Sequence, residues 1–311
     1  MADCQLCGSH HSEDACPQTR TGQVIDNYVV GLLLGVGGIA AVYTAKHLKL
    51  GREIAIKVIH KRWAKDAELS QRFIREARET AALGHPAFVT VFDAGTTVDG
   101  CAYIEMDKLH GRDLYAVRTT DGPLAPDRVA SIAIQVLDAL SVLHARGTIH
   151  RDLKSSNIYL VPSDLGGERV ILLDLGFAKT NDALALTQKD QMLGTPFYIS
   201  PEQYLDPTLV DARADLFSLG IVMWEALVGD FPYEWENKRD LLAKVMHGKL
   251  ERHPAARRPD VPAWLDGIIA HVLAHKREDR FESAVAMKAA LEARGTSGPD
   301  KPGLLKRMFK L

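Results

Sequence analysis

The apolar pattern of the chain changes once, near residue 109, and this change limits the folds that the chain can adopt. Across residues 28–106 the apolar runs are short and rich in β-branched residues, a pattern typical of strands. Beyond residue 109, apolar residues recur at helical spacing over long stretches. A mostly β portion followed by a mostly α portion predicts an α+β fold with two lobes and a cleft between them.

Individual elements can be placed on this pattern. We expect strands at residues 29–34, 40–45, 53–59, 89–92 and 102–106. One helix, at residues 67–83, interrupts the strands and carries Leu69, Phe73, Ala77 and Thr80 on one face. Later helices are expected at residues 127–145, 216–227, 239–247, 264–274 and 283–293.

The composition is that of an ordinary globular protein. The chain has 311 residues, enough for two folding units, and its 46% hydrophobic and 25% charged residues argue against disorder. The net charge of −2 gives no reason to expect a nucleic-acid partner. Four cysteines are too few for a disulfide scaffold, and no secretory signal pattern opens the sequence. We therefore expect a cytoplasmic protein.

One uncharged stretch, residues 27–45, is long enough to raise the question of a membrane span. Gly31, Gly35, Gly37 and Gly38 interrupt it, and each glycine weakens a helix by about 1 kcal/mol. Two strands joined by a glycine turn account for every one of these glycines. We therefore expect no transmembrane segment here.

The glycine turn is a candidate phosphate-binding loop. Alone, a G-x-G-x-x-A run is weak evidence, because a plain hairpin uses the same residues. Strands on both sides disfavour the dinucleotide fold, in which a helix follows the loop. Glycine N–H groups can approach phosphate oxygens closely, because no Cβ intervenes. The candidate residues are Leu34, Gly35, Val36, Gly37, Gly38, Ile39, Ala40, Ala41 and Val42.

A single lysine, Lys57, lies within an otherwise apolar strand. A solvated lysine is the plain interpretation, but Ala55 and Ile59 share its face of the strand. A cation among apolar neighbours needs a partner. The helix at residues 67–83 offers Glu76 as a candidate.

A polar run at residues 150–157 (HRDLKSSN), followed by the triplet at 174–176 (DLG), decides the class. Two acids, a lysine and an asparagine in this order supply a base, a phosphate contact and metal ligands. With these motifs in this order, the chain resembles the eukaryotic-like Ser/Thr protein kinases, above all those of bacteria. The resemblance covers about residues 28–291. It implies a kinase domain at 28–293, with an N-lobe at 28–108 and a C-lobe at 109–293.

Two later segments carry the same resemblance. Residues 194–202 (GTPFYISPE) resemble the substrate-docking segment, and residues 215–220 (DLFSLG) resemble the buried helix that anchors the catalytic loop. Arg280 resembles the late arginine that pairs with the glutamate of the docking segment, here Glu202.

The resemblance implies a role for each polar residue of the first motifs. Asp152 accepts the proton of the substrate hydroxyl, and Lys154 contacts the γ-phosphate of ATP. Asn157 and Asp174 hold Mg²⁺, with Mn²⁺ as an alternative ion. A lysine two residues after the base is similar to Ser/Thr kinases rather than tyrosine kinases. Proteins are therefore the implied substrates.

The resemblance also implies a nucleotide pocket. Lys57, paired with Glu76, holds the α- and β-phosphates. The adenine is enclosed by Val42 and Ala55 above, Tyr159 below, the backbone of Asp107 and Leu109 at its edge, and Met106 at the back. Departures from the family pattern are Ala40 for a third glycine, Tyr159 for an aliphatic residue, Leu175 for phenylalanine and Ser200 for alanine. None of them removes a catalytic group.

The main alternative is a pseudokinase scaffold that binds nucleotide or partner proteins without transferring phosphate. Such a protein commonly lacks the lysine, the base or a metal ligand, and all of these are present here. Partner proteins are not identified by the sequence. Residues 294–311 form a basic tail, for which a solvated end and an amphipathic anchor both stay open.

The first 27 residues form a separate Cys/His-rich segment. Its soft ligands have the spacing of a zinc knuckle and are Cys4, Cys7, His10, His11 and Cys16. Thr19 stands where a fourth cysteine would complete the pattern. A zinc-binding partner module and a segment without Zn²⁺ therefore both stay open.

The activation segment, residues 174–195, carries a candidate phosphosite. Thr187 lies near its middle, where kinases of this type carry an activating phosphate. Arg151, Lys179 and Arg72 are the cations that would receive the phosphate. We expect autophosphorylation there to activate the enzyme; the alternative is an exposed loop hydroxyl.

Overall fold

A computed structural model describes residues 19–163, 166–175, 196–206, 208 and 210–296. The chain forms two compact units, each made of two separate stretches. Met1–Asp113 and Asn157–Thr195 form the first unit, and Leu114–Ser156 and Pro196–Leu311 form the second. The chain therefore crosses between the units three times. These units differ from the predicted lobes chiefly in that the stretch after residue 156 returns to the first unit.

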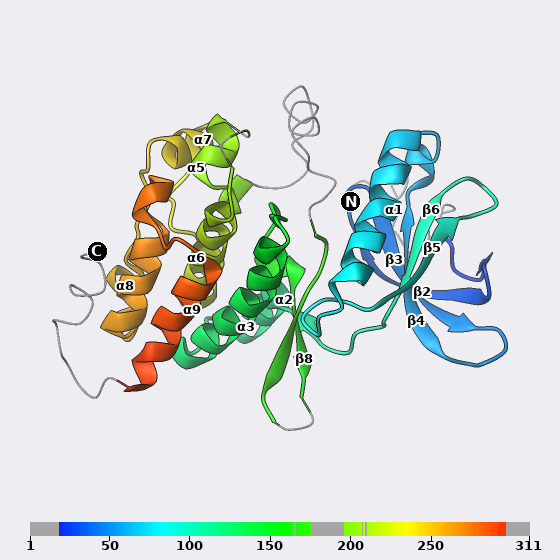
Figure 1. Cartoon of the computed structure of the whole chain (residues 1–311), viewed down its shortest axis with the longest axis horizontal. Coiled ribbons are helices and arrows are strands. Elements are labelled where there is room, and N and C mark those ends of the chain that lie inside the picture. Colours follow the sequence, from blue (N-terminus) through cyan, green and yellow to red (C-terminus); the bar gives the residue numbers. More distant parts are fainter. Residues whose placement is uncertain (1–18, 164–165, 176–195, 207, 209, 297–311) are drawn as a thin grey trace. The chain divides into compact units, whose positions relative to one another are not determined.

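Six antiparallel strands form the main sheet of the first unit, in the order β1-β2-β3-β4-β6-β5 (Figure 1). They are β1 (Val24–Ile25), β2 (Tyr28–Val36), β3 (Ala40–His47), β4 (Glu53–Ile59), β5 (Val91–Thr96) and β6 (Ala102–Met106). The uncharged stretch at residues 27–45 lies mostly in the β2–β3 hairpin. This confirms the predicted arrangement of strand, glycine turn and strand.

Helix α1 (Ala67–Leu83) packs on one face of this sheet, against β5 and β6 (Figure 1). It begins after Asp66, whose side chain accepts a hydrogen bond from the Leu69 N–H at 2.9 Å. It ends at Gly84, which has a left-handed φ of 58° that glycine adopts without strain. Phe73 is buried on the helix face that the sequence predicts to be apolar.

The sheet's own side chains form a second apolar cluster on its other face. Its larger members are Tyr43, Ile54, Ile56, Val58 and Tyr103. Because both faces are covered, successive side chains of β4 and β6 are buried whichever way they point. A polar residue in these strands therefore needs a specific partner.

A small antiparallel sheet, in the order β7-β8-β9, completes the first unit. Its strands are β7 (Arg112–Asp113), β8 (Ile158–Pro162) and β9 (Glu168–Leu172). Phe88 forms a parallel bridge with Leu172, and the Leu172 N–H donates to the Ala87 carbonyl at 2.7 Å. These bonds attach residues 157–175 to the first stretch of the unit.

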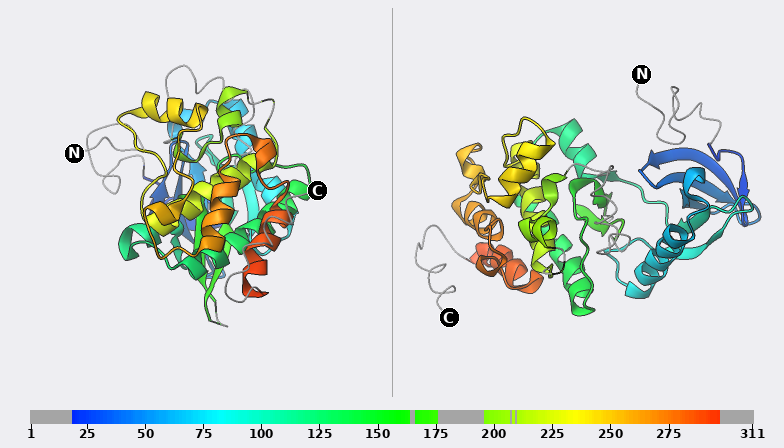
Figure 2. Two further views of the ribbon diagram at one scale, coloured as in Figure 1. Left: turned by 90° about the vertical axis from the view of Figure 1, so that its left-hand side faces the viewer. Right: turned by 90° about the horizontal axis from the view of Figure 1, so that it is seen from above.

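Helices make up the second unit as the structure describes it (Figures 1 and 2). They are α2 (Leu114–Asp121), α3 (Pro126–Ala145), α5 (Pro201–Leu205), α6 (Arg213–Val228), α7 (Lys238–Met246), α8 (Ala263–Val272) and α9 (Ala284–Glu292). Helix α6 is buried along most of its length, and α3 and α8 pack against it. The five predicted late helices are confirmed as α3, α6, α7, α8 and α9.

By length and composition, α3 is the one helix among the described residues that could span a bilayer. Half of its most apolar window is buried in the structure. Val136, Leu137 and Leu140 belong to this buried set. Packing against α6 and α9 accounts for the apolar composition of the helix.

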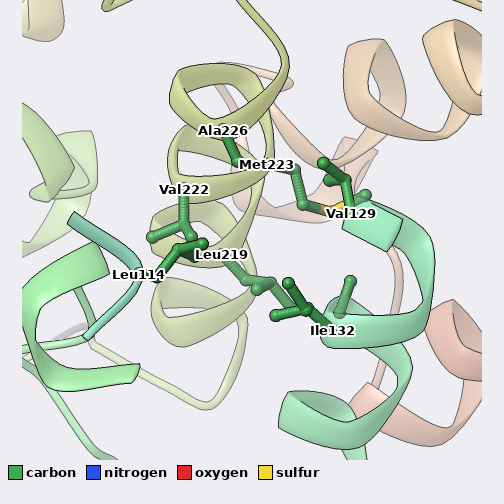
Figure 3. Close-up of a pocket in the computed structure, with 8 residues that line it drawn as sticks. Leu114, Val129, Ile132, Leu219, Val222, Met223 and Ala226 are labelled. Carbon is green, nitrogen blue, oxygen red and sulfur yellow. The ribbon is translucent and has the colours of Figure 1, made fainter. Parts of the chain in front are cut away.

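A small apolar cavity lies between α2, α3 and α6 (Figure 3). Its lining residues are Leu114, Val129, Ile132, Ala133, Leu219, Val222, Met223 and Ala226. No polar side chain points into it, so it offers nothing to a phosphate or a metal ion. The cavity belongs to the helical core.

Candidate active site

One face of the main sheet gathers the predicted nucleotide contacts. Val42 pairs with Lys57 across β3 and β4, and Ala55 pairs with Met106 across β4 and β6. Directly opposed residues share a face, and so do residues two apart on a strand. Val42, Ala55, Lys57 and Met106 therefore lie together on the face that α1 covers in part.

The glycine turn joins β2 to β3 beside this face. The Gly37 N–H donates to the Ala40 carbonyl at 2.8 Å, which leaves Gly38 and Ile39 at the tip. His60 Nε2 bonds the Gly37 carbonyl at 2.7 Å, and an Arg62 guanidinium N–H donates to the Gly38 carbonyl at 2.8 Å. Two side chains from just beyond β4 thus hold consecutive carbonyls of the turn.

The segment after β6 offers backbone groups at the predicted adenine edge. The Asp107 N–H donates to the Thr90 carbonyl at 2.9 Å, so it is already used. At Asp107 the carbonyl is thus the group left for an adenine, and Leu109 follows two residues later. The predicted backbone contact with the adenine edge therefore involves the Asp107 carbonyl and the backbone of Leu109.

Tyr159 lies in β8 in the same unit, as the predicted floor of the adenine pocket. Its hydroxyl donates to the Gly111 carbonyl at 2.8 Å. A Cβ at Gly111 would lie 2.0 Å from the Leu160 carbonyl oxygen, so only glycine fits there. Burial, together with the nearby Asp113 carboxylate, raises the pKa of Tyr159, which keeps the phenol protonated and able to donate.

The predicted metal ligands come from adjoining ends of β8 and β9. The Leu173 N–H donates to the Asn157 carbonyl at 2.9 Å, which brings Asn157 beside Asp174. The Asp174 side chain is 54% exposed and forms an ion pair with Lys57. Its φ of 49° is left-handed, a conformation that aspartate tolerates better than most residues. Amide and carboxylate oxygens are ligands that Mg²⁺ accepts, so these residues fit a divalent ion.

The catalytic loop belongs to the second unit and is held by the start of α6. Buried Asp215 accepts hydrogen bonds from the His150 and Arg151 N–H groups at 2.8 and 2.9 Å. Arg151 has a left-handed φ of 60°, and these bonds offset its strain. Lys154 Nζ lies 3.2 Å from the Asp152 carboxylate. The predicted base and its lysine neighbour are thus in contact.

A hydrogen-bond chain ties this loop to the docking segment. The Tyr198 hydroxyl donates to Glu225 at 2.7 Å and lies 2.9 Å from Ser155 Oγ. Because the single phenol hydrogen goes to Glu225, Ser155 must donate to Tyr198. Arg118 pairs with the other Glu225 oxygen at 2.9 Å. Gln203 adds a bond of 3.3 Å to the Arg151 carbonyl.

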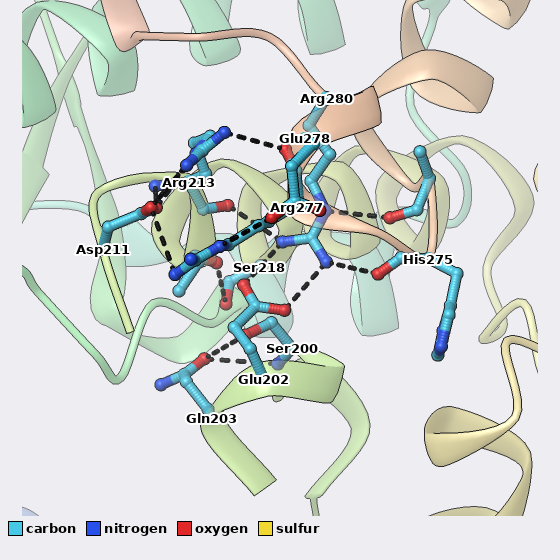
Figure 4. A network of polar contacts seen from close by, with 12 residues as sticks. Ser200, Glu202, Gln203, Asp211, Arg213, Ser218, His275, Arg277, Glu278 and Arg280 are labelled. Carbon is cyan, nitrogen blue, oxygen red and sulfur yellow. Dashed lines mark hydrogen bonds and ion pairs between the residues drawn. The ribbon is translucent and has the colours of Figure 1, made fainter. Parts of the chain in front are cut away.

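The predicted pair of Arg280 and Glu202 is confirmed (Figure 4). Two guanidinium N–H groups donate to the two carboxylate oxygens at 2.7 and 2.9 Å. The same guanidinium donates to the carbonyls of Ala274 and His275 at 2.8 and 3.0 Å. This buried pair fixes the start of α5 to the segment before α9.

Other predicted contacts keep the status of predictions. Lys57 has Asp174 as a structural partner, whereas its pairing with Glu76 on α1 stays a prediction. Arg72 forms an ion pair with Glu68. The phosphosite Thr187, its candidate partner Lys179 and residues 297–311 of the tail lie outside the described residues. So do the zinc candidates Cys4, Cys7, His10, His11 and Cys16. Within the described part of the chain, no group of three or more His, Cys, Asp or Glu residues is placed to hold a metal ion.

Sequence reasoning missed several residues that shape the site. His60 and Arg62 follow β4 and reach across to the glycine turn, and Gly111 receives the Tyr159 hydroxyl. Their position directly after the lysine strand is the one signal that could have pointed to His60 and Arg62. No local pattern predicts the bond of Tyr159, because its partner lies 48 residues away.

Comparison with known proteins agrees with this geometry. A model of the protein kinase domain matches residues 28–291, so the chain belongs to the protein kinase family. The Ser/Thr-protein kinase Pkn1 of Myxococcus xanthus is 37% identical over 317 residues, covering 93% of this chain and 45% of Pkn1. PknB of Mycolicibacterium smegmatis is 36% identical over 294 residues, covering 92% and 46%. The chain thus spans about half the length of these relatives.

A solved structure shows the same fold. The kinase domain of PknI from Mycobacterium tuberculosis, as a double mutant, is 29% identical with a TM-score of 0.68. The match covers 89% of this chain and 98% of that domain. The two-lobed α+β kinase fold predicted from the sequence is therefore confirmed, as is the resemblance to bacterial Ser/Thr kinases. Use of ATP and a divalent metal follows from the family.

Proposed function

We propose that the chain is a protein kinase that transfers the γ-phosphate of ATP to Ser and Thr hydroxyls of proteins, in a signalling role within the cytoplasm. The contact of Asp152 with Lys154 carries the proposal, because it sets a base beside a cation. The pair of Lys57 and Asp174 supports it by joining the phosphate clamp to a metal ligand. The pseudokinase alternative has no observation in its favour.

The chain's own residues supply a simple division of labour. Asp152 takes the proton from the attacking hydroxyl, and Lys154 stabilises the negative charge of the transferred group. Lys57 holds the phosphates of ATP. When bound, Mg²⁺ neutralises the charge on the phosphate oxygens, and Asn157 and Asp174 are the residues that would hold it.

Phosphate transfer from radiolabelled ATP to a generic protein substrate tests the proposal. Lys57→Ala and Asp152→Asn should each lower the rate by about 100-fold or more, because a clamp or a base is lost. Lys288→Ala is a matched control, because Lys288 pairs with Asp138 in the second unit and belongs to none of the predicted site motifs. A wild-type protein that binds ATP but transfers no phosphate would support the scaffold instead.

The Cys/His-rich segment and Thr187 complete the proposal. The segment's ligand spacing supports one structural Zn²⁺. Metal analysis of chelator-free protein should then find about one equivalent of zinc, and less than about a tenth of an equivalent would refute the zinc site.

Mass spectrometry should find phosphate on Thr187 in wild type and none in Asp152→Asn. Full activity of Thr187→Ala would refute a switch at this residue.

A further inference from the structure

A buried histidine, His60, forms a hydrogen bond with the backbone of the glycine turn. His60 is 5% exposed, and its Nε2 lies 2.7 Å from the Gly37 carbonyl oxygen. A carbonyl oxygen can only accept, so Nε2 carries the hydrogen of this bond. The His60 N–H also donates to the Ile39 carbonyl at 2.8 Å, which continues the β3–β4 ladder past the end of β4.

The side of the sheet from which His60 acts follows from strand alternation. Val58 belongs to the apolar cluster on one face, and Ile59 belongs to the cluster with Phe73 on the other. Lys57 shares the face of Ile59, and His60, with extended backbone angles of −60° and 142°, shares the face of Val58. His60 therefore draws the Gly37 carbonyl toward the face opposite Lys57.

The direction of one carbonyl fixes the direction of the next N–H. No cis peptide bond occurs among the described residues, and in a trans peptide the C=O and the following N–H point in opposite directions. With the Gly37 carbonyl turned toward His60, the Gly38 N–H points toward the Lys57 side. Arg62 donates to the next carbonyl, that of Gly38, so the following peptide is held by a side chain as well.

We propose that His60 is a positioning residue that aims the Gly38 N–H at the phosphates of the bound nucleotide. The inference rests on the proposed kinase function, because it requires a nucleotide beside Lys57. Preset N–H donors bind an anion without first losing conformational freedom. His60 therefore contributes to phosphate affinity without touching the nucleotide.

Paired titrations of MgADP and adenosine test the inference, because the two ligands differ only in the phosphates and their metal. His60→Leu should weaken MgADP binding by about threefold to tenfold, the cost of one hydrogen bond, and leave adenosine binding unchanged. His60→Gln, which keeps a side-chain N–H donor, should recover most of the loss. The KM for ATP should follow the same order, while the KM for the protein substrate stays constant.

A matched control uses the same substitution at the far end of the same hairpin. His47 accepts hydrogen bonds from the Lys49 and Leu50 N–H groups, so His47→Leu should affect neither ligand. Equal weakening of MgADP and adenosine by His60→Leu would show a purely structural role and overturn the inference. Unchanged affinity for both would overturn it too. A wild-type protein that binds adenosine and MgADP equally would overturn the kinase function together with the inference.

Discussion

Among the described residues, each unit buries one glutamate almost completely, and the two carboxyl groups have different surroundings. Glu225 on α6 is 1% exposed and receives Arg118 on one oxygen and the Tyr198 hydroxyl on the other. Glu105 on β6 is 4% exposed, and its Oε1 has no hydrogen-bond partner. Burial raises the pKa of Glu105 from 4.5 to about 7, and the nearby carboxylates of Asp26 and Asp93 add to the effect.

The difference shows two ways of keeping a carboxyl group out of water. In the second unit a cation and a phenol compensate the charge of Glu225, which can then link the docking segment to the helical core. In the described part of the first unit no cation offsets the charge of Glu105, so the group keeps its proton up to about neutral pH instead. The stability of the second unit should therefore depend on the partners of Glu225, and the stability of the first unit should depend on pH.

Removal of Arg118 should cause the largest loss of stability. Arg118→Met leaves a buried carboxylate without its cation, which commonly costs about 3–5 kcal/mol of folding free energy. Urea denaturation of the two proteins measures this loss. Arg257→Met is the matched control, because its contacts to Asp230 and Glu234 are 3.7 and 3.8 Å long and exposed. Equal effects of the two substitutions would contradict the assigned role of Arg118.

The free energy of unfolding should depend on Glu105 near neutral pH. Between pH 4.5 and about 7 the folded chain holds a proton that the unfolded chain has released. This contribution to stability is thus fully present below pH 4.5 and is lost as pH rises through about 7, a total of about 3 kcal/mol. Glu105→Gln should be more stable than wild type at pH 8 and equal to it at pH 4.5. Parallel pH profiles of the two proteins would refute the raised pKa.

Loss of the Tyr198 hydroxyl should cost less than loss of the cation. Tyr198→Phe removes one donor to Glu225 and leaves Arg118 in place, so a loss of about 1–2 kcal/mol is expected. Burial and Glu225 raise the pKa of Tyr198, so its phenol stays protonated and the effect should not vary with pH below 9. Tyr204→Phe on α5 is a control within the same segment. A pH-dependent loss would contradict the prediction.

The smallest expected effect is a shift of the pH profile. Asp93 lies opposite Glu105 in the β5–β6 register, and its charge helps to raise the pKa of Glu105. Asp93→Asn should lower this pKa and stabilise the protein at pH 7 by less than about 1 kcal/mol. Thermal denaturation between pH 5 and 8 measures the shift. A shift to higher pH would show that the Asp93 charge has the opposite effect.

Much of the fold could be predicted because the apolar periods are long and regular. The helix at residues 67–83 and the strands at 40–45, 53–59 and 102–106 are confirmed, whereas the strand predicted at 89–92 lies at Val91–Thr96. The prediction ended before most of that strand because the strand contains Asp93 and Gly95, and both residue types disfavour strands. The β7-β8-β9 sheet was missed. Strand β7 has two residues and pairs with β8 across 46 to 48 residues, which no local pattern reveals, whereas β8 and β9 pair as a hairpin that the predicted elements did not include.

In the candidate site too, the residues that could be predicted belong to local motifs, whereas those that were missed depend on contacts between separate segments. Motif order was enough to single out Asp152, Lys154, Asn157 and Asp174, because their predicted roles depend on the chemistry of their own side chains. The hydrogen bond between His60 and the Gly37 carbonyl forms because β4 ends beside the glycine turn. The spacing of residues in the sequence does not reveal this. No motif singles out Glu105, and it is buried because each face of the sheet carries an apolar cluster.

The division of the chain into alternating stretches has a consequence for its synthesis. Ribosomes deliver the chain from its N-terminus, so β2 to β6 emerge long before β8 and β9, which the first unit also contains. The edge at Ala87 and Phe88 meets its partner Leu172 only after α2 and α3 have been made. A nascent chain halted near residue 113 should therefore be a chaperone substrate, and a fragment ending there should be a poor choice for expression.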